Sequence, residues 1–381
     1  MTLAAFDGTL NPTVTFELYK NGSWTNVSST DVREVKITRG RQRADLDVQP
    51  GTLSITLDNH SGDYDPDNLS GAWVVAGASI LRDGLPGRFS LTWSGTPYPL
   101  FAGYMETIDL DAGFDASATF TFVDGLAFIA RAFMPALSSF QHSGETTSTR
   151  VTRYLNSSNV NYSRFSQNIN GSVQMQSTTE GLNVIELIKQ CVAAEAGAFY
   201  VSKNGTATML TLTDKFSRPT QLTFDDNPSH ANTVEYDSIK TTPGSLQVIN
   251  QAIIMRGKLP QVSVTKTSSV TAYGLKTLVK ECLVLSASTA HKLATYYAVK
   301  DASPTTTVSQ ITFNAFNLGT LFPDFLSSEL QDQVTVKRTT VDGRNLTMYL
   351  VIEGIDLHLS VNEFSATYYT SPMNSTKVVL P

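Results

Sequence analysis

The sequence predicts a mainly β protein with an α+β unit in its middle. Thr and Ser together make up 85 of the 381 residues, or 22%, whereas charged residues make up only 16%. Thr, Val, Tyr and Phe favour the half-buried, pleated surface of strands. Short segments of alternating polarity recur in the first third of the chain and again after residue 231, and a helical pattern lies between them.

The first 134 residues have the pattern of short strands separated by turns. Residues 14–19 alternate with period two and end at Asn21-Gly22, a strong hairpin signal. Further strands are expected at residues 35–38, 53–57, 89–93, 101–110 and 118–123. This rhythm is typical of a barrel or sandwich, so residues 1–134 are predicted to form an N-terminal β domain.

Residues 135–230 are predicted to form a separate α+β domain. Four apolar residues recur at helical spacing, Thr179 is a suitable N-cap, and Gly197 is suitable just beyond the last turn. The four residues are Leu182, Ile185, Ile188 and Val192. A helix over 181–197 is therefore expected, followed by a hairpin at Asn204-Gly205.

Residues 231–370 return to alternating strands and are predicted to form a C-terminal β domain. One helix near 288–299 interrupts these strands, with Leu293 and Tyr297 on one face. The last residues, 371–381, are expected to be a loose tail.

Charge and cysteine content exclude several classes of protein. The net charge is −6, with a pI near 5.4, which disfavours a cationic surface built to hold DNA phosphates. The two cysteines cannot form a disulfide framework. The N-terminus lacks the basic and apolar regions of a signal peptide, and no window of about 18 apolar residues exists. A chain made in the cytoplasm, without membrane insertion, is expected.

Catalytic and metal motifs are missing from the sequence. The five histidines form no zinc motif, and neither a G-x-S-x-G nucleophile elbow nor a phosphate-binding glycine loop occurs. Cys191 follows the helical pattern and Cys282 lies in an apolar strand, so both are predicted to be buried structural thiols. We therefore expect no cofactor and no enzymatic activity. A wall hydrolase that uses a carboxylate pair remains an alternative, because such pairs assemble in space.

A loop rich in aspartate follows the strand at residues 53–57. Asp63, Asp65 and Asp67 have the spacing of a calcium loop, but Asn68 and Val74 stand where that loop needs Gly and Glu. A structural turn closed by side-chain hydrogen bonds is favoured. Its residues are Asp58, Asn59, Gly62, Asp65 and Pro66. Ion binding by the three aspartates stays open.

Arg39, Arg41 and Arg43 form the densest basic cluster in the chain. Too few further cations and aromatic residues surround them for a nucleic-acid surface. The cluster is predicted to be either a solvated loop or a subunit-interface loop that pairs with acidic residues of another subunit.

The aromatic residues Trp24, Trp73 and Trp93 suggest two uses. A sugar-binding platform is one, and packing in the β core is the commoner one.

Three segments in order along the chain share a further pattern. In the first, a strand leads to Arg39-Gly40-Arg41, then to a Gly51-Thr52 strand and the turn from Asp58 to Pro66. The second is the helical region 181–197 with the strand and turn after it. The third joins residues 330–336 to residues 351–355 and His358. Together they resemble minor tail proteins, the tail-tip or baseplate hubs of long-tailed (siphovirus) bacteriophages.

This resemblance implies a structural, non-enzymatic hub built from β-barrels like those of the tail tube, with a small α+β domain. It implies a homotrimeric ring at the tail tip of the virion, joined to the distal tail protein ring, the end of the tape-measure protein, and other tip and fibre proteins. Viral DNA would pass through its lumen without specific binding. Asp332-Gln333 stands where the family more usually has Asp-Arg, which implies one altered surface contact.

Two alternatives to the hub stay open. The distal tail protein, a hexameric ring, shares the N-terminal barrel, although the helix at 181–197 favours the hub. A receptor-binding tail adhesin with a carbohydrate site would use the aromatic residues instead.

Overall fold

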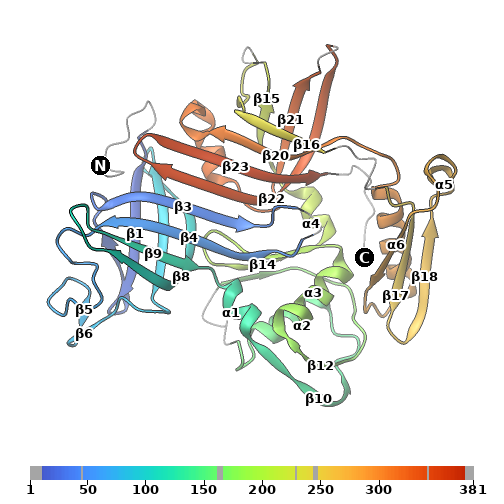
Figure 1. The fold of residues 1–381 in the computed structure, drawn as a ribbon. Helices are drawn as coiled ribbons and strands as arrows, with labels where there is room; N and C mark the ends of the chain where they lie inside the picture. Colours follow the sequence, from blue (N-terminus) through green and yellow to red (C-terminus); the bar gives the residue numbers. More distant parts are fainter. Residues whose placement is uncertain are drawn as a thin grey trace.

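The computed structural model describes residues 11–43, 46–160, 166–227, 230–242, 248–340 and 343–373. Strands dominate this part of the chain, so the prediction of a mainly β protein with an α+β middle is confirmed. A large sheet runs across the molecule, an α+β unit lies beside it, and a smaller unit of strands and helices lies at one end (Figure 1).

The N-terminal strands form one half of the large sheet. Their alternation buries one face, as in β4, where Leu53, Ile55 and Leu57 are fully buried and their neighbours are not. The strands are β1 (Thr13–Lys20), β2 (Ser23–Val27), β3 (Val32–Gly40), β4 (Gln49–Asp58), β7 (Pro86–Trp93), β8 (Thr96–Asp111) and β9 (Ser117–Val123), with a small separate hairpin of β5 (Val74–Val75) and β6 (Ala78–Ser79).

The C-terminal strands form the other half. They are β15 (Thr220–Asp225), β16 (Ser238–Thr242), β20 (Thr307–Asn314), β21 (Gln333–Thr339), β22 (Asn345–Ser360) and β23 (Glu363–Pro372). The short helix α7 (Phe322–Ser327) follows two 3₁₀ turns, Ala315–Asn317 and Gly319–Leu321. Phe322, Phe325 and Phe364 pack edge to face or tilted against one another and hold α7 on the sheet.

The two halves are joined edge to edge through β3 and β22. These strands pair antiparallel, with Ile37 opposite Leu357 and Gly40 opposite Gly354. Within the described residues, the result is a single sheet of 13 strands. The predicted N- and C-terminal β regions therefore share one sheet, a connection that the sequence analysis did not predict.

The middle of the chain forms the α+β unit. Its elements are α1 (Leu126–Arg131), β10 (Phe133–Gln141), α2 (Thr147–Leu155), β11 (Gln167–Ile169), β12 (Thr178–Asn183), α3 (Val184–Glu195), β13 (Ala198–Val201), β14 (Ala207–Leu210) and α4 (Leu212–Ser217). β10 and β12, which are separated in the chain by α2 and β11, pair antiparallel and form a two-stranded ribbon that extends from the unit (Figure 1).

The predicted helix over 181–197 is shorter than expected. Residues 178–183 form β12 and pair with β10, so Thr179 and Leu182 lie in a strand and Asn183 is the N-cap. At the other end Ala196, not Gly197, adopts the left-handed conformation that ends the helix. Pairing with a distant strand has overridden the local helical pattern of Leu182.

A second small unit follows in the chain. It contains β17 (Gln251–Arg256), β18 (Leu259–Thr265), α5 (Thr267–Tyr273), β19 (Thr277–Glu281) and α6 (Ala287–Lys300). The predicted helix near 288–299 is confirmed as α6, with Leu293 fully buried and Tyr297 partly buried. α6 packs against β17 and β18.

Two apolar cores lie within the described residues. One packs against the large sheet and includes Phe120, Phe224 and Phe313. The other joins the α+β unit to the second small unit through residues such as Ile188 and Leu293. Cys191 and Cys282 lie in this second core at 0% and 1% exposure, which confirms their predicted burial.

The domain boundaries drawn from the sequence do not coincide with the strand pairing. β15 ends before residue 230, yet it pairs in parallel with β21 of the C-terminal half. β23 runs to Pro372 and buries Ser371, so the predicted tail at 371–381 begins inside a strand, while residues 374–381 lie outside the described part. No helix in the described ranges has the length and apolar character needed to span a membrane.

Candidate functional site

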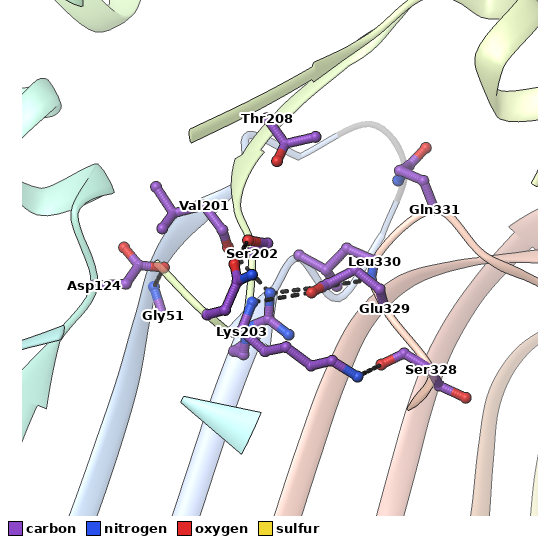
Figure 2. A network of polar contacts seen from close by, with 12 residues as sticks. Gly51, Asp124, Val201, Ser202, Lys203, Thr208, Ser328, Glu329, Leu330 and Gln331 are labelled. Atoms are coloured by element: carbon purple, nitrogen blue, oxygen red, sulfur yellow. Dashed lines mark hydrogen bonds and ion pairs between the residues drawn. The ribbon is translucent and has the colours of Figure 1, made fainter. Parts of the chain in front are cut away.

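Buried charged side chains gather where the two halves of the large sheet meet the α+β unit. They come from five separate segments of the chain, and most are less than a tenth exposed. We call this cluster the junction and define it by Arg39, Arg41, Asp124, Lys203, Glu329 and Glu353. Figure 2 shows part of it, with Lys203 reaching Ser328 and Asp124 beside Gly51.

The junction begins where β3 and β22 approach each other most closely. Gly40 has a φ of +85°, a conformation that side chains rarely adopt, and a Cβ there would lie 2.3 Å from the carbonyl oxygen of Glu353. A Cβ on Gly354 would lie 2.5 Å from the carbonyl oxygen of Arg41. Glycine at both positions therefore allows β3 and β22 to approach closely at this point. Arg39 and Arg41 flank Gly40 in the sequence.

Arg39 and Glu329 form a buried ion pair between the two halves. The Arg39 guanidinium lies 2.6 Å from Glu329 Oε1 and also donates to the Val201 carbonyl oxygen at 3.0 Å. The backbone N–H groups of Lys203 and Leu330 donate to the same carboxylate. Burial alone would raise the pKa of Glu329, but Arg39 and these N–H donors outweigh it and hold that pKa below its usual value.

Lys203 ties the α+β unit to the end of α7. Its ammonium donates to the carbonyl oxygens of Leu326 at 2.7 Å and Ser328 at 3.1 Å. A cation suits this position because the last carbonyls of a helix lack partners within the helix. Burial lowers the pKa of Lys203 to about 8.

Arg41 and Glu353 form a second ion pair, next to the first. Arg41 contacts Glu353 Oε2 through Nε at 2.9 Å and through its terminal nitrogen at 2.7 Å. Gln331 and Ser371 donate to the same carboxylate. Burial raises the pKa of Glu353, but the positive charges of Arg41 and Lys215 outweigh burial, so the pKa falls to about 2.

Asp124 links β4 to the start of the α+β unit. It accepts hydrogen bonds from the backbone N–H groups of Gly51 and Leu126, at 2.8 and 2.9 Å. Burial raises the pKa of this carboxyl to about 7. A Cβ on Gly51 would lie 2.7 Å from Asp124 Oδ2, so glycine at this position leaves room for the hydrogen bond.

Asp332 extends the junction and is 1% exposed. Its carboxylate contacts Arg218 at 2.5 Å and accepts from the amide of Gln221 and the backbone N–H of Glu329. Asp332 therefore closes the turn between α7 and β21 from inside the protein.

Gln333 stands where the family more usually has arginine. It is partly exposed and donates to the Phe216 carbonyl oxygen. The altered surface contact therefore stays a prediction.

Two of the three arginines predicted for a subunit-interface loop are paired within the chain. Arg39 lies inside strand β3 at 5% exposure, so it does not belong to a solvated loop. Arg41 follows the end of β3 and is partly buried against Glu353. Contact of this segment, including Arg43, with a second subunit stays a prediction.

The aspartate-rich loop forms a hydrogen-bonded turn. Asn59 accepts from the backbone N–H of Tyr64, Asp65 accepts from that of Asp67, and Asp58 pairs with Arg33. Gly62 has a φ of +72°, and Pro66 follows Asp65 in the same turn. No group of three or more potential metal ligands occurs in the described residues, so the geometry supplies no ion site for Asp63, Asp65 and Asp67.

The tryptophans do not form one platform. Trp73 is buried, and Trp93 packs edge to face on Phe322 with 5.2 Å between ring centroids. Trp24 is partly exposed, with the Arg88 guanidinium 4.5 Å from its ring centroid. The aromatic rings thus serve mainly as packing groups.

The junction fixes positions and offers no reactive group. Its carboxylates are engaged by arginines or backbone N–H groups, and its lysine is engaged by carbonyl oxygens. Burial raises the pKa of the Cys191 thiol to about 12 and that of Cys282 to about 11, which disfavours the reactive thiolate. The arrangement suits a rigid connection between three parts of the protein.

The two buried carboxylates Glu353 and Asp124 predict a stability maximum near pH 4, where the gain from one balances the loss from the other. Because the folded pKa of Glu353 is lowered from 4.5 to about 2, its contribution is present above pH 4.5 and is lost as the pH falls toward 2. Because the folded pKa of Asp124 is raised from 3.8 to about 7, its contribution is present below pH 3.8 and is lost as the pH rises through 7.

Urea unfolding at pH 2.5, 4 and 7.5 measures this profile. Glu353→Gln should flatten the limb below pH 4, and Asp124→Asn should flatten the limb above pH 4. Unchanged slopes in both variants would show that other groups set the pH dependence.

Sequence reasoning missed the acidic partners of the arginines. Glu329 and Arg39 are 290 residues apart in the chain, and Glu353 was noted only as part of a strand pattern. For Glu353 the available signal was a lone carboxylate inside an apolar strand sequence, because buried charges are nearly always paired, whereas Glu329 lies outside any strand and gave no such signal.

Comparisons with known proteins give a likeness of fold and not of sequence. No protein-family model matches the chain, and no curated protein is similar to it in sequence. Among solved structures, the 43 kDa tail protein of prophage MuSo2 from Shewanella oneidensis matches 96% of this chain and 100% of its own, with a TM-score of 0.59 and 11% identity.

Two further structures match over nearly the full length. A tail protein from Neisseria meningitidis MC58 covers 94% of this chain and 96% of its own, with a TM-score of 0.60 and 9% identity. Prophage tail protein gp18 from Listeria monocytogenes EGD-e covers 93% and 94%, with a TM-score of 0.53 and 8% identity. The chain therefore has the fold of phage tail proteins.

Proposed function

We propose that this chain is a structural hub of a bacteriophage tail, located at the tail tip or baseplate of a long-tailed phage of the siphovirus type. The observation that carries the proposal is the likeness of fold to phage tail proteins over almost the entire length of both chains. Because fold alone does not fix function, the site adds the second support. The junction fixes the two β-rich halves and the α+β unit relative to one another and presents no reactive group.

The proposed assembly is a homotrimeric ring. Two β-rich halves per chain would let three copies follow a six-fold tail tube, with each subunit in head-to-tail contact with the next. The ring would join the distal tail protein ring to the tip and fibre proteins and hold the end of the tape-measure protein. It would close the channel until adsorption and then open by movement of subunits, with no covalent step.

The charge of the chain agrees with a channel for DNA. A net charge of −6 provides no general attraction for phosphates, so DNA would pass without counterion-release binding. The assembled ring is expected to have a lumen that is not electropositive, which a reconstruction of the ring would reveal.

Position and copy number in intact tails test the proposal. Electron cryomicroscopy of purified particles should place the chain on the tail axis with three-fold symmetry, at three copies per particle. Six copies in a ring beneath the tube would instead identify a distal tail protein. Many copies at the tail periphery would identify a receptor-binding adhesin, and either outcome would refute the hub.

A further inference from the structure

A hollow of about 610 Å³ opens between the α+β unit and the second small unit. One wall is the two-stranded ribbon of β10 and β12 with α3 behind it, and the other is the turn between β17 and β18 with the segment after β19. The junction lies elsewhere in the fold, so this hollow is a separate feature.

The wall of the hollow is apolar where it faces solvent. Phe140, Leu182 and Leu285 line it and are 55%, 41% and 38% exposed. These exposed side chains come from both walls, Phe140 and Leu182 from one and Leu285 from the other. Exposed apolar surface gathered in a hollow often marks an interaction site.

The hollow carries a positive charge without a matching acid. The Lys258 ammonium lies 4.1 Å from the centroid of the Phe140 ring, and no described carboxylate pairs with it. Glu180 also lines the hollow, but its carboxylate is directed to Arg153 at 2.6 Å and its side chain is 4% exposed. The chemistry that complements this site is therefore an apolar group beside an anion.

The floor of the hollow is held rigid by buried hydrogen bonds. The Gln176 amide donates to the carbonyl oxygens of Arg256 and Val284, at 2.9 and 3.0 Å. The Arg256 guanidinium donates to the Leu285 carbonyl oxygen at 2.6 Å, and Arg256 is 5% exposed. These contacts link both walls, so the hollow exists before any ligand arrives, which lowers the entropic cost of binding.

We propose that this hollow docks a segment of another protein of the tail, one that carries adjacent apolar side chains and a carboxylate. The apolar side chains would fill the space between Phe140, Leu182 and Leu285, and the carboxylate would pair with Lys258. A polypeptide segment suits this site because it can present apolar side chains to both walls and a carboxylate to Lys258 at the same time. That the partner is a tail protein rests on the function proposed above, whereas the binding of an apolar anion in the hollow does not.

The first test uses the purified chain and the dye 1-anilinonaphthalene-8-sulfonate, which combines apolar rings with an anion. Saturable binding is expected, and Lys258→Glu should weaken it about fivefold, since it removes a charge attraction and adds a repulsion. Lys276→Glu makes the same charge change at an exposed lysine outside the hollow and should leave binding unchanged. Equal affinities for the two variants would refute the site.

The second test identifies the occupant in intact particles. A photoreactive benzoylphenylalanine at position 140 should cross-link to a different tail protein, at a segment with apolar residues next to an acidic one. The same residue at position 114, where Phe114 is fully exposed, is the control for random contact. Cross-links to a second copy of this chain, the same products from both positions, or no product at 140 would overturn the proposal.

Discussion

Replacing Arg39 by methionine is expected to destabilise the protein by about 3 to 5 kcal/mol, because removing one partner of a buried ion pair leaves an uncompensated charge. Glu329 would keep its two backbone donors but lose its guanidinium partner at 2.6 Å. The nearby ammonium of Lys203 offsets part of the loss, so the lower end of this range is expected. The midpoint of urea unfolding measures the effect.

Two further variants separate the charge effect from lost packing. Arg39→Met combined with Glu329→Gln should cost less than Arg39→Met alone, since no unpaired carboxylate remains. Arg131→Met removes an ion pair with Glu106 whose side chains are 67% and 37% exposed, and it should cost less than about 1 kcal/mol. Equal losses of unfolding free energy for Arg39→Met and Arg131→Met would mean that the buried Arg39–Glu329 pair stabilises the protein no more than an exposed pair.

Gly40→Ala is the second change with a large expected effect, a loss of more than about 3 kcal/mol. The left-handed conformation alone costs an alanine about 1 to 2 kcal/mol. The new Cβ would also overlap the carbonyl oxygen of Glu353, which is fixed by a hydrogen bond from the Arg41 backbone N–H at 2.9 Å. The two strands must therefore separate at this point, and the neighbouring ion pairs must move with them.

Gly22→Ala is a closely matched control. Gly22 has a φ of +81°, nearly the same as Gly40, and an added Cβ there would have nothing within 4 Å. The loss of unfolding free energy in Gly22→Ala should not exceed about 1 to 2 kcal/mol, the amount that the left-handed conformation costs an alanine. Hydrogen exchange should show faster opening of β3 and β22 in Gly40→Ala than in Gly22→Ala, and similar values for both variants would contradict the close approach.

Local elements could be predicted from the sequence because local patterns determine them. The alternation of β4 and the apolar spacing of α6 were read correctly, as was the burial of Cys191 and Cys282. Where a distant strand competes with a local pattern, the prediction was wrong. Leu182 continues the helical spacing of α3, yet it lies in β12 because residues 178–183 pair with β10.

The junction could not be predicted because its contacts join residues far apart in the chain. Arg39 in its sequence context resembled an exposed loop residue, and only the pairing of β3 with β22 places it beside Glu329. The hollow lined by Phe140 and Lys258 depends in the same way on how two units pack together. Neither arrangement leaves a periodic signal in the sequence.

The pairing of β3 with β22 also has a consequence for synthesis. At a translation rate of about 5 to 20 residues per second, roughly 15 to 60 seconds separate the emergence of Gly40 from that of Gly354. During that time one edge of β3 has no partner, and such an edge is a site for aggregation. The nascent chain therefore exposes this edge until the ribosome has completed β22.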